Sequence, residues 1–466
     1  MIALYSVLLL PIIGALLMFC VGNRRISANC NIVTATAIFI ASLFVVRHFL
    51  YNGAFLVAGG QFHIDALSCL MMTLATFVMM TNAVFSNAFM WHNKSIVHMR
   101  LYNVLYQLFA FMMLLALSTN NIGILWIAVE GITLSTVLLV DLYHTKESIE
   151  AAWKYFILCI IGIGLALFGT ILVYFADSQH SSGMLWTVLV DNIRYLDTVT
   201  IKIAFVFLFV GYGTKIGLVP LHSWLPDAHS QSPAPVSVLL SGLSLNVALY
   251  ALLRFKILTN LLTINELANN LMIIFGLLSF IVATILLQRQ NNLKRLFSYS
   301  SIEHMGLITF AFGLGTYNAA FIGLFYLIVH SLTKSAIFVI LGNIAKEGHS
   351  LIRNQPILGW SLLVTTLVLS GIPPFGIFTS ESMLFIDCVK KSSLLAALLV
   401  IGLIMALSGL LRNIQPIVYG EQTSVEIINV CLWPAILHLS LVLILGVYIP
   451  PVLQHLLCCA ANLITG

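Results

Sequence analysis

Residues 201–221 read IKIAFVFLFVGYGTKIGLVPL, and residues 222–235 continue as HSWLPDAHSQSPAP. The first stretch is long and apolar enough to predict a membrane-spanning helix, yet Lys215 lies inside it. A lysine at the centre of a membrane helix costs about 2.5–3.5 kcal/mol on insertion scales. Gly217 and Pro220, just after it, weaken the helical hydrogen bonds. A buried charge on a broken membrane helix indicates an ion-transfer site.

The composition of the whole chain is that of a polytopic membrane protein. It has 466 residues, of which 60% are hydrophobic and 8% charged, with a mean hydropathy of +1.04; soluble domains carry about 25% charged residues. We therefore predict one all-α membrane domain over 1–466 with about fourteen transmembrane helices. The predicted spans are 1–21, 31–50, 65–90, 101–118, 121–140, 153–175, 201–221, 233–256, 271–288, 299–314, 319–342, 358–372, 376–400 and 432–450, with 395–411 competing with 376–400.

The segments outside these spans predict no soluble domain. The longest polar connections, about 141–152, 176–200 and 412–430, are too short to hold a nucleotide-binding or catalytic fold. The first segment lacks the basic start and small-residue cleavage site of a signal peptide, so we expect it to be a retained span. The eight cysteines form no C-x-x-C pair, and we predict no metal site, no cofactor and no nucleic-acid partner.

The basic residues of the loops predict the orientation. With the N-terminus outside, the inward loops hold more lysine and arginine than the outward loops. Lys94 and Lys346 count among the inward residues, and Arg254 and Lys256 among the outward ones. The asymmetry favours an N-terminus outside a bacterial or archaeal cytoplasmic membrane.

A carboxylate in a second apolar span is the first candidate partner of Lys215. Glu130 lies in NNIGILWIAVEGITLSTVLLV, residues 120–140. A lone carboxylate at that depth is either protonated or faces a cation across the bundle. Movement of a Glu130–Lys215 pair would let the lysine take up and release a proton. The alternative is a static ion pair that only holds two helices together.

Two further spans carry ionisable side chains. His330 and Lys334, in FYLIVHSLTKSAIFVILGN at residues 325–343, are four residues apart and share one helix face. His304 enters the next-earlier span after the basic stretch QRQNNLKRLF, and Glu303 beside it is expected nearer the membrane edge. Buried histidines are usually core residues with satisfied hydrogen bonds; a lysine one turn away favours proton transfer instead.

A second interrupted segment contains Glu381. Residues 371–382 read GIPPFGIFTSES, where Pro373 and Pro374 interrupt the apolar run as Pro220 does earlier. Two Gly/Pro-interrupted helices in separate halves of a chain are typical of transporters built from repeats. Glu381 would then end a line of charges that begins at Glu130; the alternative is an interfacial carboxylate at a helix end.

Two other patterns do not support a site. The G-x-G in GYGTKIG lies inside a span with no preceding strand, so it is not a dinucleotide-binding motif. His222, Asp227 and His229 lie at the helix break near the predicted inner surface. We expect them to satisfy freed backbone groups and to form a proton entry rather than to bind a metal.

Several of these stretches resemble the antiporter-like membrane subunits of respiratory complex I, group 4 hydrogenases and Mrp cation/proton antiporters. They are GTKIGLVPLHSWLPDAHSQSPAPVSVLLSG (213–242), NNLKRLFSYSSIEHMG (291–306), HSLTKS (330–335), GIPPFG (371–376) and the Glu130 span. The resemblance covers about residues 100–410. Within the family, SPAPVSVLLSG, LFSYSSIEHMG and HSLTKSAIF followed by GN are most similar to the membrane component F of hydrogenase-4.

The resemblance implies two inverted five-helix repeats, about 100–256 and 271–412, each with one broken helix, and flanking helices at both ends. It implies that Glu130 tunes Lys215 as the proton-holding lysine, that His304, His330 and Lys334 form a relay, and that Glu381 is the exit carboxylate. It also implies partner membrane and peripheral subunits that carry the redox centres. The roughly sixteen residues after the last span are not expected to hold the long lateral helix of the largest complex I subunit of this type.

One position departs from the complex I pattern. Where those relatives often carry a second lysine, this chain has Asn246, whose amide can hydrogen-bond water but cannot carry a proton. We therefore expect a proton-translocating subunit of a hydrogenase-4 or NADH-quinone oxidoreductase type of complex. The alternatives are a cation/proton antiporter or ion-coupled uptake subunit without a redox partner, and a structural anchor whose charges no longer function.

Overall fold

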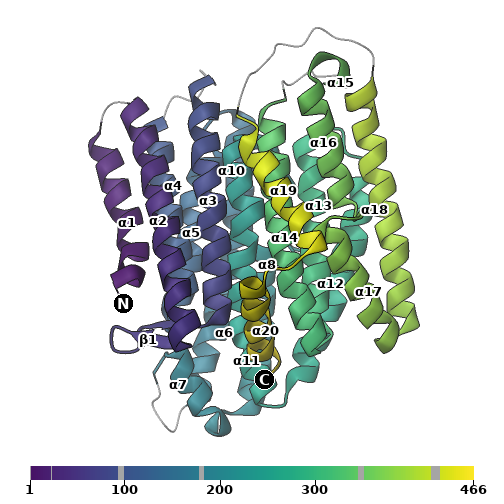
Figure 1. The fold of residues 1–466 in the computed structure, drawn as a ribbon. Coiled ribbons are helices and arrows are strands. Elements are labelled where there is room, and N and C mark those ends of the chain that lie inside the picture. Colours follow the sequence, from purple (N-terminus) through teal and green to yellow (C-terminus); the bar gives the residue numbers. More distant parts are fainter. Residues whose placement is uncertain (1, 22–23, 93–98, 178–182, 345–350, 421–430) are drawn as a thin grey trace.

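Long helices stand side by side in the computed structural model, which describes residues 2–21, 24–92, 99–177, 183–344, 351–420 and 431–466 (Figure 1). The helices of the first half are α1 (Ile2–Cys20), α2 (Arg24–Asn52), α3 (Ala66–His92), α4 (Met99–Ser118), α5 (Ile122–Val140), α6 (Lys146–Ala176), α7 (Trp186–Asp191), α8 (Thr198–Ile216), α9 (Trp224–Gln231), α10 (Ala234–Leu239) and α11 (Leu245–Leu261). Those of the second half are α12 (Asn265–Leu287), α13 (Leu293–Gly313), α14 (Tyr317–Gly342), α15 (Leu351–Asn354), α16 (Pro356–Leu369), α17 (Gly376–Lys391), α18 (Ser393–Tyr419), α19 (Trp433–Val447) and α20 (Pro451–Thr465).

The helical, membrane-spanning class of fold is confirmed. Among the described residues, eleven helices are long and apolar enough to cross a bilayer, or twelve if α19 and α20, bent by 75°, form one span. Helix α16 has only 14 residues, and the serines, Glu303 and His304 of α13 make it more polar than a typical span. The count of about fourteen therefore remains a prediction.

Both predicted helix breaks occur, and neighbouring side chains satisfy part of the freed backbone. Helix α8 ends at Gly217, whose φ of +87° suits a residue without a side chain. The Val219 amide donates to Ser279 Oγ at 2.9 Å, and the Trp224 indole donates to the Thr214 carbonyl at 2.9 Å. The second break separates α16 from α17 and contains Gly371, with φ +68°. Such contacts make irregular backbone tolerable inside a membrane protein.

Three details of the predicted spans are corrected. Two helices, α17 and α18, divided at Ser392, occupy the region after Pro374, so the competing run 395–411 lies in a helix of its own and the helix that begins at 376 ends at Lys391. Helix α18 continues to Tyr419, well into the predicted connection 412–430, of which 421–430 lie outside the described residues. Arg254 and Lys256 are not loop residues; they lie in α11 with 4% and 1% of their surface exposed. Lys94 and Lys346, used for the orientation, lie outside the described residues.

One end of the bundle, called here the hairpin end, carries the two termini, α7 and a small β-hairpin (Figure 1). Strand β1 (Phe55–Val57) pairs antiparallel with β2 (Phe62–Ile64). Helices α3 and α12 begin at this end, and α11 runs toward it. The other end of the bundle, where a loop connects α5 to α6 and another connects α12 to α13, is called the opposite end.

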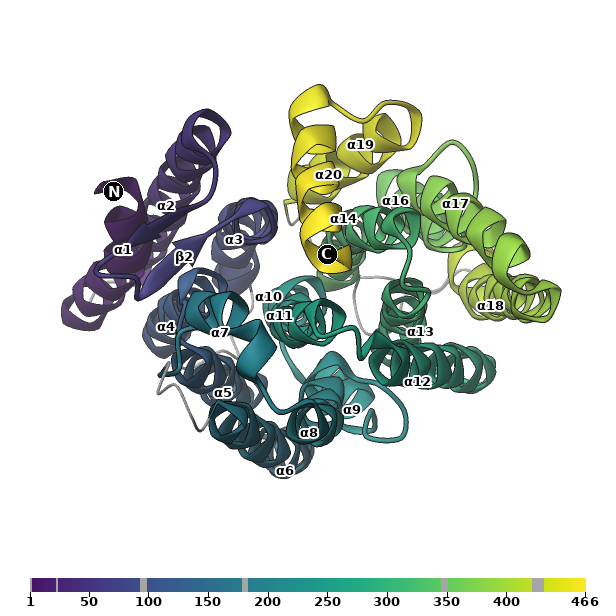
Figure 2. The same cartoon turned by 90° about the horizontal axis from the view of Figure 1, so that it is seen from below.

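Two helical segments form the buried centre. The most apolar windows of residues 234–261 and of α14 are completely buried, whereas those of α1, α2, α6 and α18 are 33–39% buried. Seen along the bundle, α11 lies between the group of α5 and α8 and the pair α12 and α13, and α14 lies among α13, α16 and α20 (Figure 2). A five-residue π-helical segment, Leu240–Ser244, joins α10 to α11; such bulges often occur at functional sites.

Candidate functional site: a buried polar axis

Lys215 lies in the last turn of α8 and has no exposed surface. Its Nζ donates to Tyr155 Oη at 2.6 Å and to Thr133 Oγ1 at 2.9 Å. The Tyr155 hydroxyl is also hydrogen-bonded to Thr136 Oγ1 at 2.7 Å, and its ring stacks on Trp224 with centroids 4.6 Å apart. The lysine is thus held by hydroxyl groups rather than by a carboxylate.

Glu130 lies one turn before Thr133 on α5, so both face the same side of the helix. Among the described residues it forms no ion pair with Lys215, and its buried Oε2 has no hydrogen-bond partner. The two groups still lie close enough to interact electrostatically. The predicted pair is therefore not in contact: Thr133 takes the lysine hydrogen bond in place of the carboxylate.

The second half of the site begins with a stripe along α14. Tyr326, His330, Lys334 and Phe338 follow one another at intervals of four residues, and all four are fully buried. Lys334 Nζ donates to the Phe297 carbonyl at 3.1 Å, and both ring nitrogens of His330 lack partners among the described residues. The predicted shared face of His330 and Lys334 is thus part of a longer buried face that also carries Tyr326 and Phe338.

Hydrogen bonds connect this stripe to two other helices. His304 Nδ1 lies 2.7 Å from the Tyr326 hydroxyl, which donates to Glu381 Oε1 at 2.8 Å. The rings of His304 and His330 have centroids 5.5 Å apart. Helices α13, α14 and α17 therefore bring His304, His330 and Glu381 together, with Tyr326 as the bridge. Sequence reasoning misses Tyr326, although its place four residues before His330 is a visible signal.

Glu303 corrects another expectation. The sequence predicts a place near the membrane edge, but 1% of its surface is exposed and its Oε2 has no partner within the described part of the chain. It interacts electrostatically with Lys334. The basic residues that precede it in sequence suggest an interface, whereas α13 continues inward past them.

Asn246 occupies the centre between the two halves. Its Nδ2 donates to the Gly242 carbonyl at 2.7 Å, which also accepts a 2.5 Å hydrogen bond from Ser331 Oγ on α14. Asn246 Oδ1 and Ser244 Oγ are buried without partners among the described residues. Buried polar atoms of this kind are normally satisfied by water.

Two ionisable side chains of α9, just after the first helix break, lie in different surroundings: Asp227 is near the surface and His229 is buried. Asp227 bridges Lys154 and Arg295, at 3.4 and 3.1 Å, across the opposite end. His229 is fully buried and stacks on Phe338 with centroids 4.7 Å apart and planes 6° apart; neither ring nitrogen has a described partner. Within the described residues, no cluster of three metal-ligating side chains occurs.

Comparison with known proteins shows the family to which the chain belongs. A model of the membrane region of NADH:quinone oxidoreductases and Mrp antiporters matches residues 119–406. The hydrogenase-4 component F homolog of Methylacidiphilum infernorum is 42% identical over 464 residues, covering 96% of each chain. The chain belongs to the NADH:quinone oxidoreductase/Mrp antiporter family.

One further relative and two solved structures show how far the likeness extends. The NADH-quinone oxidoreductase subunit N 2 of Thermodesulfovibrio yellowstonii is 30% identical over 68% of this chain and 69% of its own. A chain of an archaeal membrane-bound sulfane sulfur reductase superposes with a TM-score of 0.88 at 21% identity, covering 99% and 97% of the two chains. A chain of the Mrp complex from Dietzia sp. gives 0.86 at 18% identity, covering 99% and 96%.

All six residues predicted for the axis lie inside the region that the family model matches. The two structural neighbours support the fold of the family and, at their low identity, nothing finer. The resemblance to this family that the sequence predicted is confirmed.

Proposed function

We propose that this chain is a proton-translocating subunit of a membrane-bound, multi-subunit oxidoreductase of the hydrogenase-4 or NADH-quinone type. One observation carries the proposal: Lys215, fully buried on a broken helix, donates hydrogen bonds to two neutral hydroxyl groups and, among the described residues, to no carboxylate, with Glu130 nearby. A buried lysine without a contacting carboxylate is an expensive arrangement that suits reversible protonation. The identity of 42% with a hydrogenase-4 component F homolog supports the oxidoreductase context.

The relay in the second half has a defined hydrogen-bond direction. The Tyr326 hydroxyl has one hydrogen and donates it to Glu381, so it must accept from Nδ1–H of His304. A proton arriving at His304 Nε2 from the side of His330 would then push one proton through Tyr326 to Glu381. His304 would be left protonated on Nε2 and would have to reset before the next transfer.

Proton entry from the opposite end would pass His229. The stacking on Phe338 places this ring one turn beyond Lys334 along α14, or about 6 Å along the axis. Above it, Asp227, Lys154 and Arg295 form the surface contact between α9, α6 and α13. We assign His229 as the first buried proton acceptor and Lys334 as the next.

The two halves would communicate through water around Asn246. Asn246 Oδ1 and Ser244 Oγ, which have no partner in the described part of the chain, lie on α11 and on the π-helical segment before it. These two segments pack between α8, which carries Lys215, and α14, which carries His330. An amide can support a chain of hydrogen bonds but cannot store a proton. A change of charge at Lys215 would therefore act on Lys334 and His330 mainly by electrostatics.

The relatives that match along most of this chain are named as components of oxidoreductases, so partner subunits are expected to hold the redox centres. The lipid bilayer surrounds the remaining apolar faces. We propose a bacterial or archaeal cytoplasmic membrane, with the hairpin end outside. A cation/proton antiporter without redox partners remains the competing function.

Replacement of Lys215 by alanine tests the proposal. The whole complex, purified in mild detergent and reconstituted in vesicles, should acidify or alkalinise the lumen when its substrates are added. Lys215→Ala should lose this proton movement while the subunits still copurify, as mass spectrometry would show. Normal pumping by the variant would refute the role of Lys215, and copurification with antiporter subunits alone would support the competing function.

A further inference from the structure

A polar stripe leads from the centre of the bundle toward the hairpin end. Asn246, Tyr250 and Arg254 follow one another at intervals of four residues on α11. The stripe covers about 12 Å along the helix axis. Tyr250 Oη donates to the Leu117 carbonyl at 3.1 Å and contacts Ser68 Oγ at 3.0 Å. The region around Asn246, which we propose to link the Lys215 half with the His330 half, thus has a third polar branch, which the proposed route does not use.

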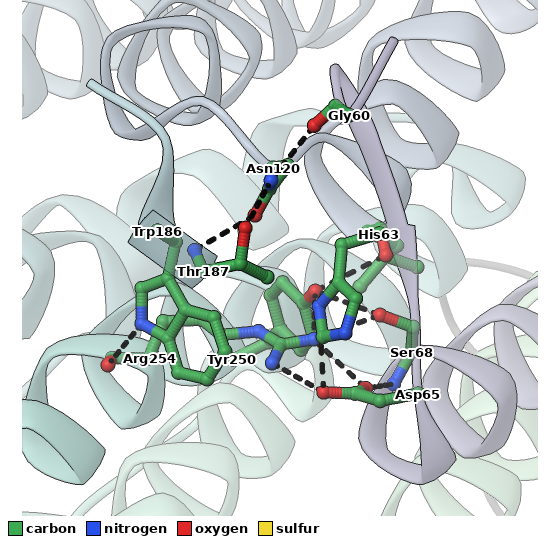
Figure 3. A network of polar contacts seen from close by, with 10 residues as sticks. Gly60, His63, Asp65, Ser68, Asn120, Trp186, Thr187, Tyr250 and Arg254 are labelled. Carbon is green, nitrogen blue, oxygen red and sulfur yellow. Dashed lines mark hydrogen bonds and ion pairs between the residues drawn. The ribbon is translucent and has the colours of Figure 1, made fainter. Parts of the chain in front are cut away.

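Arg254 ends this branch. Its guanidinium donates to both oxygens of Asp65, at 2.5 and 2.9 Å, and to Ser68 Oγ and Tyr250 Oη, both at 2.8 Å (Figure 3). It lies between the rings of Trp186 and Tyr250, 4.9 Å from each centroid. Only 4% of its surface is exposed.

Segments of the hairpin end cover the arginine. Trp186 of α7 donates its indole N–H to the Arg254 carbonyl at 2.9 Å, and His63 of β2 stacks on Trp186 (Figure 3). Asn120 joins the hairpin to α7 through Gly60 and Thr187, at 2.7 and 2.8 Å. The cavity beside Arg254, lined also by His63 and Tyr250, has a volume of about 10 Å³. That space holds at most a single water molecule.

We propose that Arg254 is an electrostatic barrier that closes the α11 branch to protons. The inference rests on the proposed proton-handling function. A guanidinium stays protonated at any physiological pH, so it cannot pass a proton on and it repels one that approaches. Fixed positive charges at narrow points exclude protons and cations from water pathways in the same way. Asp65 holds the guanidinium in place and offsets part of its charge; the barrier is a cation that cannot release its proton, together with the positive charge that remains.

This role differs from that of a structural clamp in a measurable way. A clamp requires both partners, so removing either Asp65 or Arg254 would loosen the hairpin end and have the same consequence. A barrier requires only the positive charge. Arg254→Lys and Asp65→Asn keep that charge, whereas Arg254→Gln removes it and keeps hydrogen-bond donors.

The experiment measures passive proton leak through the whole complex in vesicles. A potassium diffusion potential drives protons inward without any substrate of the complex, and a pH-sensitive dye reports their entry. We expect the leak to rise about tenfold or more in Arg254→Gln, since a unit charge acts strongly within a few ångströms in a protein interior. The wild-type complex, Arg254→Lys and Asp65→Asn should remain tight. Adding Tyr250→Phe to Arg254→Gln should lower the leak again, because it removes a hydroxyl from the stripe.

Two results would overturn the barrier. One is an assembled Arg254→Gln complex that leaks no more than wild type, and the other is an Asp65→Asn complex that leaks as Arg254→Gln does. If Arg254→Gln fails to assemble, Asp65→Asn is compared with the wild type and with Arg254→Lys instead. An Asp65→Asn complex that leaks more than Arg254→Lys would then overturn the barrier. Substrate-driven pumping by the wild-type complex is measured in the same vesicles, so failure of the proposed function is recorded separately.

Discussion

Replacing Tyr326 by phenylalanine removes one oxygen atom from the relay and leaves the ring in place. The lost hydroxyl connects His304 Nδ1, at 2.7 Å, to Glu381 Oε1, at 2.8 Å. Both partners would then be buried without that bond, and a hydrogen bond to a charged group is worth about 1.5–3 kcal/mol. If the protonated relay loses one such bond, the activation free energy of proton transfer rises by a similar amount and the transfer slows by about 10- to 160-fold.

Substrate-driven pumping by the reconstituted complex measures this effect, with redox turnover recorded in parallel. Tyr212→Phe is the matched control, because the buried Tyr212 hydroxyl has no hydrogen-bond partner among the described residues. Its removal should leave pumping unchanged. If Tyr326→Phe pumps within twofold of the control at equal subunit content, the Tyr326 bridge does not carry protons and the order of the relay is wrong.

Two predictions concern stability. A side chain on Gly211 would lie 2.6 Å from backbone atoms of α6, so Gly211→Ala should separate α8 from α6 and lower stability by about 1–3 kcal/mol; Gly164→Ala, with open space around it, should be neutral in the same thermal unfolding assay. Burial would raise the pKa of Asp65, but the charge and hydrogen bonds of Arg254 lower it to about 2. The pair's contribution, on the order of 2–3 kcal/mol, is therefore present above about pH 4 and lost as the pH falls through 2. Asp65→Asn should be less stable than wild type by a constant amount from pH 4 to 7, and a difference that disappears by pH 5 would contradict the shift.

The sequence was sufficient for the parts of the fold and site that depend on local chemistry. Lys215 and Glu130 stand out because a charge in an apolar run is rare, and both helix breaks follow from glycine and proline. Such signals need no knowledge of which helices are neighbours. They predicted the class of fold and two of the residues at the centre of the proposed axis.

Contacts between helices could not be predicted in this way. Tyr155 and Tyr326 are two of fifteen tyrosines, and a tyrosine in an apolar helix is as common in packing as in proton transfer. Arg254 follows a long apolar run, and a charged residue at that place is assigned to a loop. Its partner Asp65 is 189 positions away, so the sequence gives no sign of the buried ion pair. Glu303 is misplaced for a related reason: the nearby basic residues indicate an interface, and the sequence does not give the depth of α13.

The three polar branches that we propose to meet near Asn246 differ in what ends them, and in the proposed function this difference would give the axis its direction. One ends at Lys215, which can gain and lose a proton; one leads through His330 and His304 to Glu381, which can do the same. The third ends at Arg254, which cannot. Because the amide at the junction stores no proton, a proton near it must move on, and the permanent cation makes the α11 branch the least favourable way out. A lysine at position 246 would hold protons at the junction; with asparagine there, the ends of the branches decide where protons go.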